Sequence, residues 1–98
     1  MLIKAGVDIS KLNTEIRKAL NEISYIYNHQ GEELVITSTY EGSHSAGSKH
    51  YANDAVDIRK PHNDIADVLN SLEDNLGTRF FVLEETTHIH IHYIRSIP

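Results

Sequence analysis

Residues 85–94 read Glu-Thr-Thr-His-Ile-His-Ile-His-Tyr-Ile. Side chains at positions i, i+2 and i+4 of a strand share a face, so we expect His88, His90 and His92 to point the same way. The intervening isoleucines then form the packed face of the same strand. The segment predicts a strand with one apolar side and one side rich in imidazole. That second side is either a solvated polar surface or a site for chemistry. We expect His92, at the far end of the strand, to face solvent.

Two segments upstream, residues 10–28 and 65–76, have apolar residues every three or four positions. This spacing predicts two amphipathic helices. We expect Asp8 or Ser10 to cap the first helix and Gly77 to end the second.

The remaining periodic segments predict strands at 33–40, 55–59, 79–83 and 89–94, the last two joined by a turn near 85–87. Residues 41–53 have no period and predict a loop of a length that is usually functional or disordered. The order of elements predicts an α+β domain with a small, mainly antiparallel sheet and two helices packed on one face.

Composition excludes several classes of function. The chain has 98 residues, a formal charge of −5 and no cysteine, so we expect one domain over 1–98 and no disulfide or thiolate metal site. Acidic charge argues against nucleic-acid binding. No apolar run is long enough for a membrane span or a signal peptide, so we expect a protein that is cytoplasmic as synthesised. We also expect a monomer.

Two polar residues, His50 and Asp57, stand at the end of the long loop and in the strand after it. Asp57 lies in the run Ala-Val-Asp-Ile, where burial is expected, and a buried carboxylate is costly unless it is paired or bound to a metal. A metal would remove that cost. The alternative is an ion pair with Arg59, two residues further on and on the same face.

Glu85 and His88 have the spacing Glu-x-x-His at the start of the histidine strand. A catalytic zinc usually has three protein ligands and one position for water, beside a carboxylate that acts as general base. His50, Asp57 and one histidine of the last strand could supply the ligands. Glu85 could supply the base.

The motifs Ser-x-His-x-x-x-x-Ala-x-Asp, at 48–57, and Glu-x-x-His-x-His, at 85–90, resemble those of the zinc D-Ala-D-Ala carboxypeptidases and their phage endolysin and vancomycin-resistance relatives. The resemblance implies the hedgehog/DD-peptidase fold and a Zn²⁺ cofactor. It also implies hydrolysis of peptidoglycan stem peptides, either as a D-Ala-D-Ala carboxypeptidase or as an L-Ala-D-Glu-type endopeptidase. A zinc-stabilised binding module of the same fold without turnover is the alternative.

The resemblance assigns zinc ligation to His50, Asp57 and His88, and the role of base to Glu85. It also implies that Ser48 lies near the terminal carboxylate of the substrate.

His90 has three possible roles. It could be the third ligand in place of His88, most readily if Glu84 were the base, because strand alternation would put Glu84 on the same face as His88 and His90. It could instead donate a hydrogen bond to the oxyanion or contact substrate.

The chain departs from the family pattern at two places. Asn53 stands where relatives usually have glycine, and asparagine tolerates a positive φ at modest cost. Relatives often have an arginine near residues 40–42 that holds a substrate carboxylate, and this chain has none there. We therefore expect Arg59, Lys49 or His44 to bind the substrate, or the substrate to lack a free C-terminal carboxylate.

Overall fold

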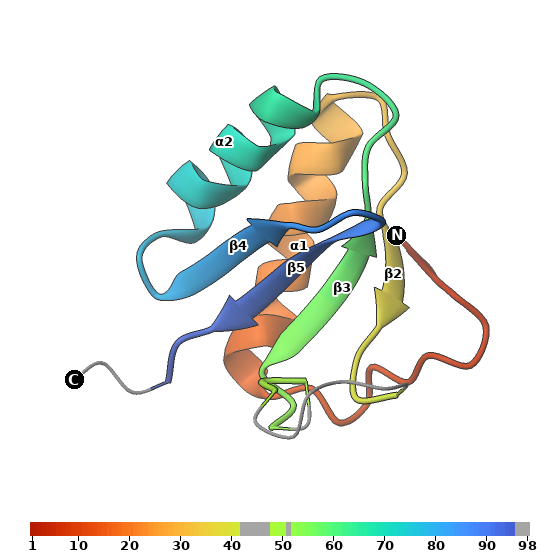
Figure 1. The fold of residues 1–98 in the computed structure, drawn as a ribbon, viewed down its shortest axis with the longest axis vertical. Helices are drawn as coiled ribbons and strands as arrows, with labels where there is room; N and C mark the ends of the chain where they lie inside the picture. The colour runs from red at the N-terminus through yellow and green to blue at the C-terminus, as the bar shows by residue number, and fades with distance from the viewer. Residues whose placement is uncertain (42–47, 51, 96–98) are drawn as a thin grey trace.

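The computed structural model describes residues 1–41, 48–50 and 52–95. These residues form two helices and a five-stranded sheet (Figure 1). The elements in chain order are β1 (Leu2–Ile3), α1 (Thr14–His29), β2 (Val35–Ser38), β3 (Ala55–Arg59), α2 (Ile65–Leu76), β4 (Phe80–Glu84) and β5 (His88–Tyr93).

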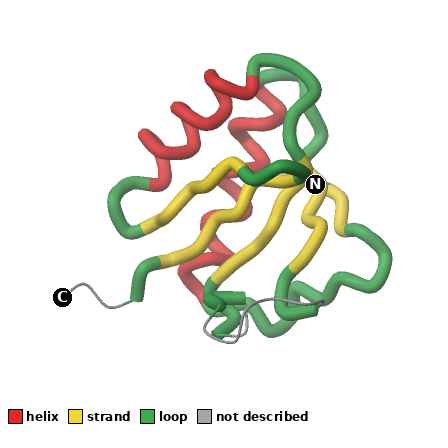
Figure 2. The backbone as a smooth tube through the Cα atoms, in the orientation of Figure 1, coloured by secondary structure: helices red, strands yellow, loops and turns green. Residues whose placement is uncertain are grey.

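The strands lie in the order β1-β2-β3-β5-β4, as Figure 2 shows in yellow. Each pair is antiparallel except β1 with β2, which is parallel. This is the α+β architecture predicted from the sequence. The two-residue strand β1 was not predicted, because a segment that short has no measurable period.

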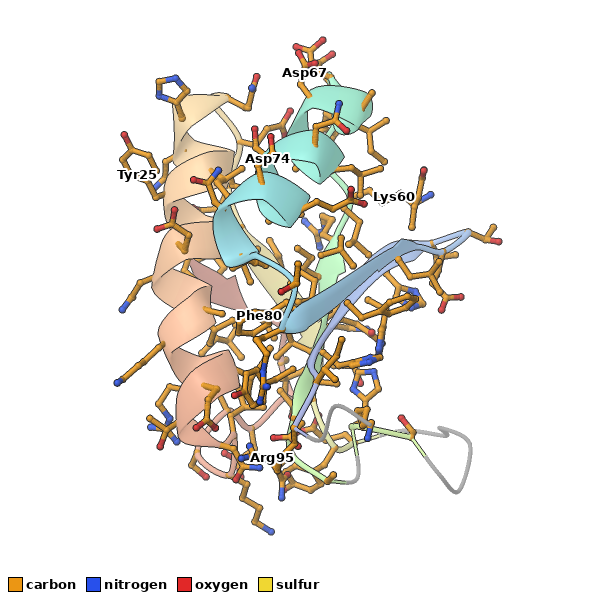
Figure 3. The ribbon with its side chains drawn as sticks, turned by 90° about the vertical axis from the view of Figure 1, so that its left-hand side faces the viewer. Tyr25, Lys60, Asp67, Asp74, Phe80 and Arg95 are labelled. Atoms are coloured by element: carbon orange, nitrogen blue, oxygen red, sulfur yellow. The ribbon has the colours of Figure 1, made fainter. Side chains whose placement is uncertain are left out.

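Both helices cover the same face of the sheet (Figure 3). Alternate residues of the central strands point toward them, so Val56, Ile58, Ile89 and Ile91 are fully buried. The helices contribute Ile16, Ile23, Val68 and Leu72 to the same core. The other face of β3 and β5 therefore carries the polar residues of the alternating pattern.

The first helix begins at Thr14 with Asn13 as its N-cap residue, so the expected cap by Asp8 or Ser10 is wrong. Asp8 Oδ1 instead accepts a hydrogen bond from the Ser10 amide at 2.8 Å. Arg17 Nη2 lies 2.7 Å from the Ser10 carbonyl oxygen. These bonds hold the segment before α1 in turns, because the amide and carbonyl groups of Ser10 bond to side chains and not to backbone partners in a helix.

The second helix and the hairpin follow the predicted pattern closely. Gly77, at φ +82°, ends α2, and residues 85–87 join β4 to β5 where the turn was expected. Within the described residues, no helix is long and apolar enough to cross a membrane.

Candidate metal centre

The site lies on the face of the sheet that the helices leave open. Asp57 of β3 is the register partner of His90 of β5, so their side chains project from neighbouring positions on the same face. On the other side of β3, a register shift brings Ser38 of β2 opposite Asp57. Two adjacent strands therefore fix two of the candidate ligands.

His50 reaches the same face from the turn that precedes β3. The Asn53 amide donates to the His50 carbonyl oxygen at 3.0 Å, and the Asp54 amide donates to the Lys49 carbonyl oxygen at 3.0 Å. Asn53 has φ +62°, which confirms the expectation that asparagine replaces glycine at a left-handed position. The turn thus directs His50 back over the sheet.

Three side-chain atoms converge at this point. His50 Nε2 lies 3.1 Å from Asp57 Oδ1 and 3.0 Å from His90 Nδ1, and His90 Nδ1 lies 3.2 Å from Asp57 Oδ1. A tetrahedral zinc ion with bonds of about 2.0 Å requires ligand atoms about 3.3 Å apart. The spacing and the nitrogen and oxygen donor set both fit a zinc ion, and these three residues could hold one.

The orientation of His50 is fixed by the backbone immediately after β2. His50 Nδ1 lies 2.6 Å from the carbonyl oxygen of Thr39, which can only accept a hydrogen bond. Nδ1 therefore carries the proton, and in the neutral ring Nε2 presents a lone pair to the site. A carbonyl partner on the far nitrogen is a common way to orient a metal-binding histidine.

Asp57 is nearly buried, with 7% of its surface exposed. Burial raises the pKa of its carboxyl group, but the close polar contacts with the His50 and His90 rings lower it more, so the pKa lies well below its ordinary value. Among the described residues, its ion-pair partners are His50, His88 and His90. The alternative pairing with Arg59 is not observed there, although Arg59 lies on the same face.

A family model described as Peptidase M15 matches residues 2–92. The chain belongs to the Peptidase M15 family. Comparison with curated proteins and with solved structures found no match. The match covers both helices, strands β1 to β4 and β5 as far as His92, and membership makes this chain a metallopeptidase by family.

In this M15 peptidase, His88 lies outside the compact group of three. Its Nε2 atom is 3.5 Å from Asp57 Oδ2, the oxygen that does not face His50 and His90. Its Nδ1 atom is 3.0 Å from the Thr87 hydroxyl oxygen. The geometry thus groups His90 with His50 and Asp57, whereas the resemblance to the family assigned the third ligand position to His88.

The turn of the hairpin separates the two glutamates. The Glu85 amide donates to the His88 carbonyl oxygen at 2.8 Å, which continues the pairing of β4 with β5 beyond Glu84. Glu85 is thereby opposite His88 and on the histidine face, whereas Glu84 is opposite the buried Ile89. Glu84 instead pairs with Lys60 at 3.1 Å, so the expectation that it shares the face of His88 and His90 is wrong. The turn reverses the alternation that a single continuous strand would have.

The residues expected to contact substrate have different positions. Arg59 is exposed at the end of β3, opposite His88 in the register. The Ser48 hydroxyl accepts a hydrogen bond from the His50 amide at 3.1 Å, so it also supports the turn that carries His50. His44 lies outside the described residues.

His92 contributes more to the site than the sequence indicated. It was expected to face solvent, but it is half-buried, and its Nδ1 atom lies 2.8 Å from His90 Nε2. Burial first, and then the neighbouring His90, lower the pKa of His92 to about 4. The i, i+2 spacing of the two histidines was the available signal, because it puts both rings on one face.

Proposed function

We propose that this M15 peptidase uses zinc to hydrolyse amide bonds in peptidoglycan stem peptides. The observation that carries the proposal is the convergence of His50 Nε2, Asp57 Oδ1 and His90 Nδ1 within 3.0–3.2 Å of one another. Zinc bound there would lower the pKa of water toward about 7 and polarise the carbonyl group of the scissile bond. Two neutral imidazoles and one carboxylate leave such a site with a net positive charge, which suits an oxyanion.

Glu85 is the proposed general base. Its carboxylate is exposed and, by strand alternation, on the same face as the three ligands. In this role it accepts the proton of the attacking water and returns it to the nitrogen of the leaving group. Glu84 lacks this position, since its carboxylate is engaged by Lys60 on the other face.

Arg59 is the proposed anchor for a substrate carboxylate. It is exposed, and it lies two residues from Asp57 on the same face of β3. A guanidinium group binds a carboxylate through two parallel hydrogen bonds, which fixes the orientation of the bound peptide. An acidic D-residue or a free C-terminus of a stem peptide would supply that carboxylate.

The apolar side chains of β4 extend the same surface. Phe81 and Leu83 are the register partners of His92 and His90, and both are more than 40% exposed. They give the site an apolar border on the side of the edge strand. The alanine methyl groups of a stem peptide match such a border in size and polarity.

The test is mass spectrometry of purified muropeptides incubated with the zinc-loaded protein. We expect loss of a terminal alanine in the carboxypeptidase case, or release of a stem-peptide fragment in the endopeptidase case. Glu85→Gln should reduce turnover by about 100-fold or more, whereas Glu84→Gln should retain it. Unchanged muropeptides with zinc bound would contradict the proposal and favour a non-catalytic zinc-binding module.

A further inference from the structure

The second nitrogen of His90 has a partner of its own. His90 Nε2 lies 2.8 Å from His92 Nδ1, and the two rings meet edge to face at an angle of 68°. His90 Nδ1, on the other side of the ring, faces His50 and Asp57. The imidazole of His90 therefore connects His50 and Asp57 to His92, which lies outside the group of candidate ligands.

The protons in this arrangement follow from the chemistry of imidazole. A neutral ring has one nitrogen with a proton and one with a lone pair. For Nδ1 of His90 to donate its lone pair to a metal, the proton must be on Nε2. That proton then requires an acceptor, which His92 Nδ1 is positioned to provide.

His92 is itself held in place. Its ring stacks on Phe81 of β4 with the ring centroids 5.0 Å apart and an angle of 27° between the planes. Phe81 and His92 are register partners, so the stacking is set by the β4–β5 ladder. The acceptor nitrogen of His92 therefore has a fixed direction toward His90.

We propose that His92 is a positioning residue that fixes the tautomer and ring orientation of His90, so that His90 Nδ1 binds the metal. This inference rests on the metal site of the proposed function. It assigns His92 a role without contact to substrate or metal. Partners of this kind change metal affinity by about 10–100-fold when they are removed.

Two substitutions of His92 separate the hydrogen bond from the ring stacking. His92→Asn retains an acceptor, because its Oδ1 atom occupies the position of Nδ1, but it loses the ring. His92→Phe retains a ring on Phe81 and loses the acceptor. We expect His92→Phe to weaken zinc affinity, measured by competition with a chelator, by about 10–100-fold. His92→Asn should stay within about threefold of the unsubstituted protein.

The outcomes distinguish this inference from the function on which it rests. An unsubstituted protein that does not bind zinc would contradict the proposed function itself. Zinc binding by the unsubstituted protein, with equal affinity in His92→Phe, would overturn the positioning role alone. An equal loss in His92→Asn and His92→Phe would also overturn it, since the ring rather than the acceptor would then matter.

A measurement on the unsubstituted protein gives the same test without a variant. Long-range ¹H–¹⁵N correlation spectra of the zinc-loaded protein report which nitrogen of each histidine carries the proton. We expect His90 to have its proton on Nε2, protected from exchange by His92. A proton on His90 Nδ1 would overturn the inference.

Discussion

Asp57 and His90 are direct partners across the β3–β5 ladder, and their facing atoms, Oδ1 and Nδ1, lie 3.2 Å apart. Backbone hydrogen bonds on both strands fix this pair, so its geometry does not depend on a loop. His50 is the exception, because it enters the group from a turn. The proposed metal centre therefore combines two candidate ligands on rigid elements with one whose position depends on local backbone conformation.

Replacing Asp57 by asparagine should reduce zinc affinity by more than about 100-fold. The amide preserves the shape of the side chain but removes the negative charge that the ion requires. We expect this loss of affinity to exceed the usual effect of replacing a residue that only contacts a ligand. Isothermal titration with zinc measures the change. Asp74→Asn is the matched control, since Asp74 is exposed on α2 (Figure 3). Equal affinities for both variants would contradict the assignment of Asp57.

Substitutions of Asn53 should test the conformation of the turn that carries His50 without changing any candidate ligand. At φ +62° a side chain with a Cβ atom is strained, so Asn53→Ala should lower the free energy of unfolding by about 1 kcal/mol. Asn53→Gly should fold at least as stably, because glycine adopts this conformation without strain. Urea denaturation of the two variants measures the difference. A more stable Asn53→Ala than Asn53→Gly would contradict the account of this turn.

The sequence was most informative where one period continued over a whole element. Strand 55–59 was predicted with its observed bounds, and the helix that begins at Ile65 ends at Leu76, before Gly77, as expected. The start of α1 was placed too early, because bonds made by Asp8 and Arg17 replace helical ones. Such contacts depend on geometry that residue spacing alone does not contain.

The candidate ligand group could be predicted only in part for a similar reason. The segment from Ser48 to Arg59 contains no second histidine that could replace His50, and the motif places Asp57 at a defined position. Each of these two residues could therefore be identified from the sequence. His88, His90 and His92 are identical side chains on one face, and only the register with Asp57 distinguishes them. The same holds for Glu84 and Glu85, whose faces depend on the number of residues in the turn.

Acid stability should depend on the contact between Asp54 and Arg95. Hydrogen bonds from Arg95 lower the pKa of Asp54 below 3.8, against the effect of burial, and Arg95 also lowers the pKa of Glu15. A carboxyl group with a lowered pKa in the folded state stabilises the protein above its unfolded pKa. This contribution is lost as the pH falls through the folded value.

Arg95→Gln should therefore flatten the loss of stability below about pH 4, because the folded pKa values of Asp54 and Glu15 return toward their ordinary values. Urea denaturation between neutral and acid pH measures the slope. Arg79→Gln is the control, since Arg79 donates to the Tyr93 hydroxyl and the Arg95 carbonyl oxygen and, within the described part of the chain, contacts neither carboxylate. The contribution of Asp57 is common to both variants, so their difference isolates the Arg95 contacts. Identical slopes would contradict this account.

The central claim is that His50, Asp57 and His90 form the metal centre. Its most direct test is the zinc content of His90→Ala and His88→Ala after dialysis against trace zinc, measured by mass spectrometry of the metal. We predict about one equivalent in the unsubstituted protein and in His88→Ala, and almost none in His90→Ala. Zinc retained by His90→Ala and lost from His88→Ala would contradict the assignment and return the third ligand to His88.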